Sequence, residues 1–154
     1  MTFQQILFCI TISFFIFSFQ SQASEGVWYN PEMKLKDLEI EIVLTDGASG
    51  ACWTNLREVR EYAEEKLYSR GAKIVKDINL SGNNFYYLNI LVSGERISMG
   101  SSRTCVGVTS LQLVNFSDSH KIILYEGKDL ISLHPTNLNN VILEEVRKKF
   151  NDMP

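Results

Sequence analysis

The chain has 154 residues, of which 45% are hydrophobic and 21% are charged, and its formal net charge is −3 at pH 7. This balance excludes a disordered chain, and the length allows one domain with a sizeable core. The sequence pI near 5.4 argues against nucleic acid as a partner, because no general basic field attracts it.

The first two dozen residues contain an uncharged apolar run from Ile6 to Phe19, followed by Ser21-Gln22-Ala23-Ser24. The length of the run is typical of a secretory signal peptide, and Ser21 and Ala23 fit the small residues of a cleavage site. We therefore expect residues 1–23 to be a signal peptide, which makes the protein periplasmic or secreted. The alternative is an uncleaved membrane anchor, although a bilayer span needs roughly 20 apolar residues.

The remaining chain is expected to form a single small domain over residues 24–154, with residues 24–36 as an extended lead-in. Apolar and polar side chains alternate over residues 38–45, which predicts a half-buried strand. A helix is predicted over residues 55–70, because apolar side chains share one stripe and Gly71 is a natural stop. The stripe consists of Trp53, Leu56, Val59, Ala63 and Leu67.

The second half of the chain is predicted to be a run of strands that ends in a helix. Strands are expected over residues 73–80, 85–92, 104–114, 121–125 and 130–133. Within the second of these, Tyr86 and Tyr87 face opposite sides, so Tyr86 is expected in the core. The terminal helix opens after Pro135-Thr136-Asn137, and its apolar face holds Leu138, Val141, Ile142, Val146 and Phe150.

The resulting order is β-α-β-β-β-β-α, which predicts an α+β fold. The later strands are close enough in sequence to pair as antiparallel hairpins. We expect a two-layer sandwich: a mostly antiparallel single sheet, with two helices packed on one face. This common scaffold carries no function by itself.

Two cysteines, Cys52 and Cys105, remain after the predicted signal peptide. Outside the reducing cytosol, two thiols in a small domain usually form one disulfide. The bond would close a loop of 105 − 52 = 53 residues. The loop-closure entropy of a chain that long corresponds to roughly 4 kcal/mol of stability.

The segment Ser49-Gly50-Ala51-Cys52-Trp53 resembles the Cys-Gly-[Ser/Ala]-Cys-[Trp/Tyr] surround of the papain-family nucleophile, with Ser49 in place of the first cysteine. The resemblance implies a cysteine peptidase-like hydrolase in which Cys52 is the nucleophile and His120 is its base. A thiol at a helix N-terminus suits that role, because the helix dipole favours the thiolate.

Metal binding is not expected, because Cys52, Cys105, His120 and His134 are scattered and lack paired ligand spacing such as C-x-x-C. No cofactor motif is present either. The most promising binding segment is residues 94–103, which are rich in Ser and Gly and are predicted to form a long loop. Its candidate contact residues are Arg96, Met99 and Arg103.

These features together predict a small exported, non-enzymatic protein of the binding, accessory or inhibitor type. Its expected partner is another exported or envelope protein, with no nucleic acid and no membrane span after signal cleavage. Two alternatives stay open: the Cys52–His120 hydrolase, and a structural component of a cell-envelope assembly.

Overall fold

The computed structural model of the protein describes residues 27–28, 33–76, 84–117, 120–134 and 136–153. The predicted signal peptide, residues 1–23, lies outside these ranges, as does part of the lead-in. The strands are β1 (Val27–Trp28), β2 (Glu39–Ala48), β3 (Lys73–Ile74), β4 (Asn84–Met99), β5 (Ser102–Ser117) and β6 (His120–His134). The helices are the short 3₁₀ turn η1 (Leu35–Asp37), α2 (Leu56–Ser69) and α3 (Asn139–Asp152).

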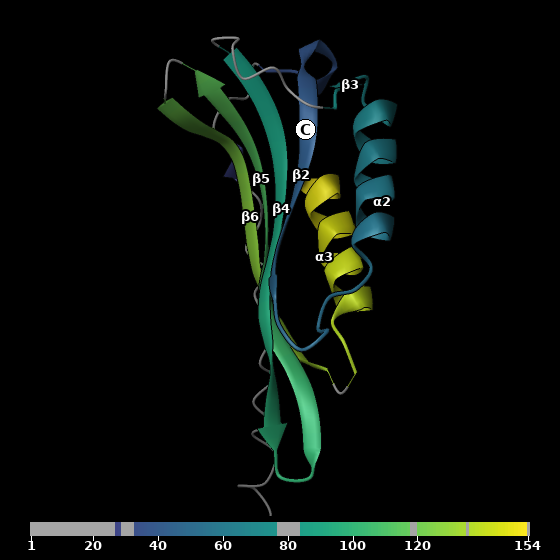
Figure 1. Ribbon diagram of the computed structural model, residues 1–154. Helices are drawn as coiled ribbons and strands as arrows, with labels where there is room; N and C mark the ends of the chain where they lie inside the picture. Colours follow the sequence, from purple (N-terminus) through teal and green to yellow (C-terminus); the bar gives the residue numbers. More distant parts are fainter. Residues whose placement is uncertain (1–26, 29–32, 77–83, 118–119, 135, 154) are drawn as a thin grey trace, which may run out of the picture.

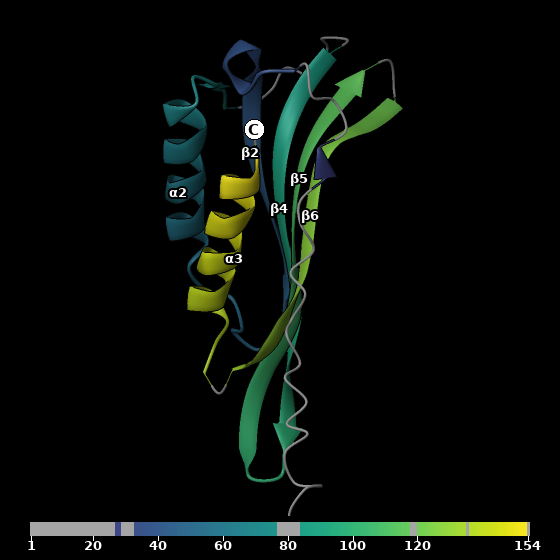
Figure 2. The same ribbon diagram turned by 180° about the vertical axis from the view of Figure 1, so that it is seen from behind.

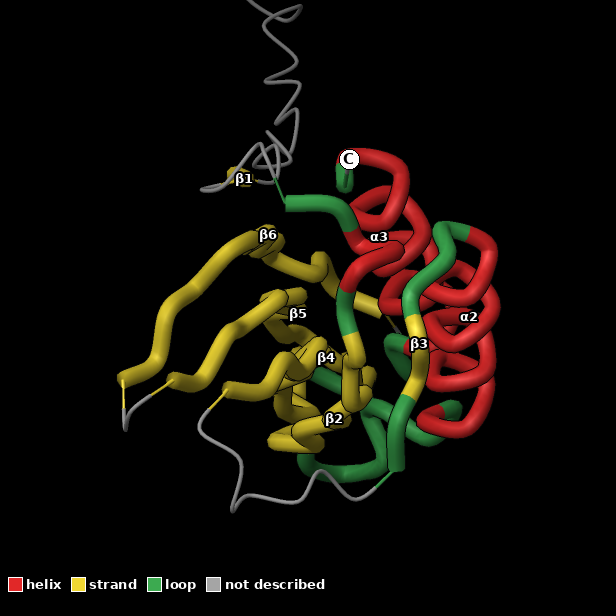
Figure 3. The backbone as a smooth tube through the Cα atoms, turned by 90° about the horizontal axis from the view of Figure 1, so that it is seen from above, coloured by secondary structure: helices red, strands yellow, loops and turns green. Residues whose placement is uncertain are grey.

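Within the described ranges, a six-stranded sheet forms the first layer, in the order β1-β6-β5-β4-β2-β3. Strand β2 runs parallel to β3 and β4, and the remaining neighbours are antiparallel. Helices α2 and α3 form the second layer and cover one face of the sheet (Figures 1, 2 and 3). The predicted α+β sandwich is confirmed. We call the opposite face, on which no described helix lies, the open face.

The core lies between the helices and the sheet. The helix α2 contributes Val59, Ala63 and Leu67, all fully buried, as the apolar stripe predicted. The sheet contributes alternate residues of its central strands, among them Leu88, Ile90, Leu111 and Leu113. Fully burying each such side chain stabilises the fold by about 1.5–3 kcal/mol.

Helix α2 ends where the sequence predicted. Gly71 has φ +82°, a left-handed conformation that suits glycine. Its N–H donates to the Tyr68 carbonyl (2.9 Å), and the Ala72 N–H donates to the Leu67 carbonyl (3.1 Å). A Cβ at Gly71 would also lie 2.9 Å from the Lys36 Cβ, so two independent constraints select glycine here.

The structure corrects three expected boundaries. The two strands predicted over residues 121–125 and 130–133 form one strand, β6, because Gly127 lies under the Lys149 side chain instead of in a turn. In the strand predicted over residues 73–80, β3 covers residues 73–74 and the described residues 75–76 are not strand, whereas residues 77–80 are outside the described part. The predicted loop over residues 94–103 consists mostly of strand, since β4 and β5 extend through it.

In the part of the chain that the structure describes, neither helix is long and apolar enough to cross a lipid bilayer.

Candidate functional site

The main feature outside the two-layer body is a projecting β-hairpin. Strand β2 pairs with β4 only as far as Ala48 and Gly94, whereas β4 and β5 stay paired up to Met99 and Ser102. We call residues 95–106 the hairpin arm. It extends beyond the ends of both helices (Figure 1). Arg96, Met99 and Arg103, predicted in a loop, therefore lie on this arm.

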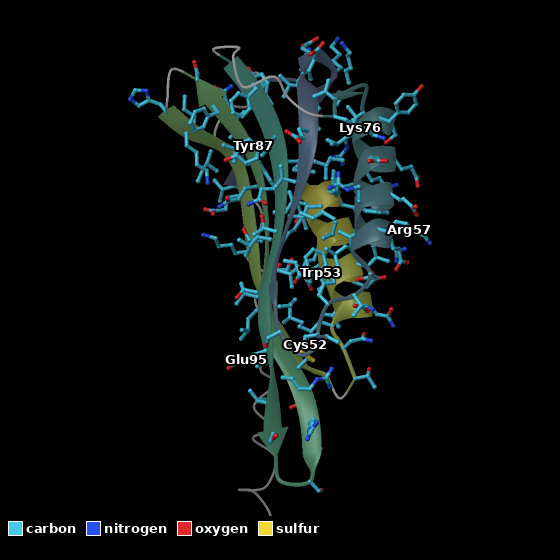
Figure 4. The ribbon with its side chains drawn as sticks, viewed as in Figure 1. Cys52, Trp53, Arg57, Lys76, Tyr87 and Glu95 are labelled. Carbon is cyan, nitrogen blue, oxygen red and sulfur yellow. A yellow bond between two sulfur atoms is a disulfide. The ribbon has the colours of Figure 1, made fainter. Side chains whose placement is uncertain are left out.

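The base of the arm carries the disulfide bond between Cys52 and Cys105, which confirms the predicted pairing. Both residues are fully buried, and their Cα atoms are 5.7 Å apart. Cys52 comes from the connection between β2 and α2 (Figure 4). Cys105 lies near the start of β5. The bond therefore fastens the arm to the layer of helices.

A tight turn brings Cys52 to the arm. Gly50 and Ala51 both have left-handed backbone conformations, with φ values of +60° and +57°. The Cys52 N–H closes the turn by donating to the Ser49 carbonyl (3.2 Å). Because Ala51 has a Cβ, its conformation is disfavoured by roughly 1–2 kcal/mol. The surrounding bonds at the base of the arm hold this strained residue in place.

Arg96 is a clamp at the base of the arm. Its Nε donates to the Gly50 carbonyl (2.8 Å), and its Nη2 donates to the Thr136 carbonyl (2.6 Å). The guanidinium thereby links the arm to the connections that precede α2 and α3. The sequence indicated Arg96 as a candidate contact residue of a binding loop. It did not reveal the clamp, because both acceptors are backbone atoms distant in sequence.

Two glycines explain why the base of the arm is strand and not loop. Gly94 and Gly107 face each other across β4 and β5. A Cβ on Gly107 would lie 2.6 Å from the Ser93 carbonyl oxygen and 3.2 Å from the Leu138 Cδ1. The fully buried Leu138 packs over both glycines. The glycines therefore provide room for Leu138 and do not mark a turn.

The beginnings of the two helices are tied to each other beside the disulfide. The Thr54 N–H donates to Asn139 Oδ1 (2.9 Å), and Asn139 Nδ2 donates back to Thr54 Oγ1 (2.8 Å). The Leu138 N–H donates to the Cys52 carbonyl (2.7 Å). The arm is thus attached to a rigid base formed by three chain segments.

The catalytic alternative does not fit this geometry. Cys52 is held in a disulfide and has no free thiol. His120 pairs with Ser117 at one end of β6, whereas Cys105 pairs with His134 at the other end. With about 3.3 Å per strand residue, the two ends of β6 are roughly 45 Å apart along the strand. The structure therefore does not bring Cys52 and His120 together.

Within the described ranges, no three His, Cys, Asp or Glu side chains converge in a way that would hold a metal ion.

A buried ionic cluster, not predicted from the sequence, fastens α3 to β6. Lys149 is ion-paired with Asp129, and the side chains are 1% and 4% exposed. Glu145 Oε2 lies 3.9 Å from the Lys149 ammonium. Burial acts to raise the pKa of Asp129, but hydrogen bonding and the charge of Lys149 hold that pKa below its usual value. Burial and the neighbouring Asp129 raise the pKa of Glu145.

The same cluster includes Tyr125 of β6. Its hydroxyl donates to the Lys149 carbonyl (3.0 Å) near the end of α3. Burial raises the pKa of Tyr125 to about 12, so the phenol stays neutral in the physiological range. These interactions join β6 in the sheet to α3 in the layer of helices. The cluster therefore helps to hold the two layers together.

Neither a known protein family nor a curated protein matches the sequence. Among solved structures, the chain is similar to PelC from Paraburkholderia phytofirmans, a dodecamer, with a TM-score of 0.53 and 13% identity over 82% of this chain and 96% of that chain. A second structure of a PelC dodecamer, a variant from the same organism, gives a TM-score of 0.48, with 11% identity over 82% and 95% of the chains. A minor lipoprotein from Acinetobacter baumannii gives 0.31, with 10% identity over 74% and 85%. The first of these likenesses shows a shared fold.

Proposed function

We propose that this protein is a small exported, non-enzymatic binding protein that contacts another exported or envelope protein through the hairpin arm. The observation that carries the proposal is the arm itself, a projecting hairpin whose base is held by a disulfide and by Arg96. An isolated two-stranded hairpin is only marginally stable in water. A hairpin anchored in this way is a preformed contact element.

Preorganisation is the physical advantage of such an arm. Binding by a flexible loop loses affinity because side chains and backbone become ordered on contact. The long loop expected from the sequence would carry that penalty, whereas paired strands with a fixed base carry much less of it. The exposed Arg103 on the arm then meets a partner in a defined position.

Export is supported by two features that do not depend on each other. The apolar run at residues 6–19 has the length and flanking residues of a signal peptide. The disulfide joins the only two cysteines outside that run, and disulfides persist mainly in oxidising compartments.

A second candidate function is that of a structural subunit in a cell-envelope assembly. It is favoured by the likeness to PelC, which is a dodecamer. In that case the partner protein is part of a fixed stoichiometric complex, and gentle extraction should recover it with this chain in a constant ratio.

An affinity experiment tests the proposed function. The tagged protein is used to capture partners from envelope extracts of its native organism, in parallel with Arg103→Ala and with the control Arg57→Ala. Arg57 lies on the outer side of α2 (Figure 4), and its side chain is 91% exposed. We expect Arg103→Ala to reduce recovery of the partner with no change in melting temperature, and Arg57→Ala to leave it unchanged. Equal recovery with all three proteins would count against the arm as the contact element.

A further inference from the structure

The two faces of the hairpin arm carry opposite charges. Side chains alternate along a strand, and Val92 faces the helices. Arg96 therefore lies on the helix side, and so does Arg103, which is paired with Ser98. Glu95 lies on the open face, as Figure 4 shows. Both Glu95 and Arg103 are exposed, and neither forms an ion pair with another residue in the described ranges.

An open recess of about 440 Å³ lies beside Glu95 at the base of the arm. Small residues line its floor, because Gly47 and Ser93 occupy paired positions of β2 and β4. Its wall contains Val108 and Leu130, which are paired across β5 and β6 and are 39% and 71% exposed. The recess therefore places apolar surface in contact with water beside the Glu95 carboxylate.

We propose that this recess receives the hairpin arm of a second copy of the chain, with Arg103 of the incoming arm opposite Glu95. The inference rests on the proposed function and names its partner. The carboxylate and the guanidinium are complementary in charge, and they lie on opposite faces of the same arm. Each copy therefore has one surface of each kind, and copies join head to tail.

A head-to-tail contact leads to a different oligomer from a two-fold symmetric contact, which ends at a dimer. Two different surfaces meet, so each added copy leaves one surface of each kind available until the rotation closes a ring. The fold of this chain is shared with a protein that is a dodecamer, which is a higher-order assembly rather than a dimer. The contact would also cover Val108 and Leu130 and remove their apolar surface from water.

Charge reversal tests the inference in solution. Sedimentation velocity and native mass spectrometry are run on the purified wild type, on Glu95→Arg, on Arg103→Glu, and on an equimolar mixture of the two variants. Arg57→Glu is the matched control, and circular dichroism checks that each variant is folded. In either variant alone, like charges meet at every contact. In the mixture, each recess finds an arm of opposite charge.

We expect the wild type and Arg57→Glu to form oligomers larger than dimers. Each variant alone should need on the order of tenfold higher concentration to assemble, and the mixture should restore assembly. If the wild type is monomeric at all concentrations, self-association is wrong, while capture of a different partner that is lost in Arg103→Ala still supports the proposed function. The proposed contact is wrong if Glu95→Arg and Arg103→Glu each assemble as the wild type does. It is also wrong if the mixture of the two variants stays dissociated.

Discussion

Removing the disulfide is the sharpest test of how the hairpin arm is held. The double variant Cys52→Ala/Cys105→Ala is suitable, because both side chains are fully buried and alanine introduces no buried hydroxyl. The closed loop has a sequence separation of 53 residues. For that length, loop-closure entropy gives about 14 cal/mol/K, or about 4 kcal/mol at 25 °C. Such a loss is a large part of the stability of a small domain.

The structure also predicts which part of the protein is loosened when the disulfide is removed. Arg96 still bonds to the Gly50 and Thr136 carbonyls, and Leu138 still packs over the glycines, so the arm should stay paired. We therefore expect a folded protein in which amide exchange accelerates first at the arm base and at the turn before α2. The strained Ala51 is expected to relax there.

Urea denaturation gives the free energy of unfolding by linear extrapolation, and hydrogen exchange read by mass spectrometry gives its location. The wild type in reductant is a second route to the same state. A loss of less than about 1 kcal/mol would refute the loop-closure reasoning. Sheet amides that exchange through global unfolding should also exchange faster, by the amount that the lost stability requires. The local action of the bond would be refuted if the arm base and the turn before α2 showed no acceleration beyond that amount.

Three further predictions concern the packing of the layers. Lys149→Met leaves the buried Asp129 carboxylate without its cation and should reduce stability by about 3–5 kcal/mol in urea unfolding; an unchanged midpoint would show that the pair contributes nothing. The pKa of Asp129 is lowered in the folded protein, so its ionisation stabilises the fold at any pH above its unfolded-state pKa of about 3.9. This stabilisation is lost as the pH falls through the folded-state pKa. Asp129→Asn should therefore flatten the decline of unfolding midpoints below about pH 4, and a decline as steep as that of the wild type would argue against Asp129 as its source. Gly107→Ala places a Cβ 2.6 Å from the Ser93 carbonyl oxygen and should destabilise the fold by about 1–3 kcal/mol. In the control Gly100→Ala, the new Cβ has nothing within 4 Å. Its loss of stability should therefore come only from the backbone strain of an alanine at φ +63°.

Several elements were predictable because their signals lie in consecutive residues. The stripe of α2 repeats with the helical period, and Val59, Ala63 and Leu67 are buried as that period requires. The alternation in β2 gave the correct inward positions, Ile40 and Ile42. The disulfide followed from having two cysteines and an expected oxidising compartment.

The glycines and charged residues were misjudged because their roles depend on distant neighbours. The Gly and Ser content of residues 94–103 indicated a loop, but Leu138 packs on Gly94 and Gly107 and makes them part of the sheet. Residues 126–129 were predicted to separate two strands, but the Lys149 side chain of α3 lies over Gly127 and pairs with Asp129, and both residues are part of β6.

By itself, the sequence determined the fold class, the central stretches of β2, β5, α2 and α3, and the disulfide partners, because periodicity and cysteine number are properties of the chain alone. Only the tertiary structure decided that the candidate binding residues lie on a clamped hairpin, that Arg96 bonds to backbone carbonyls, and that Glu95 and Arg103 occupy opposite faces. These facts depend on strand register and on contacts between segments far apart in the chain. A change of one residue in register moves every side chain to the other face.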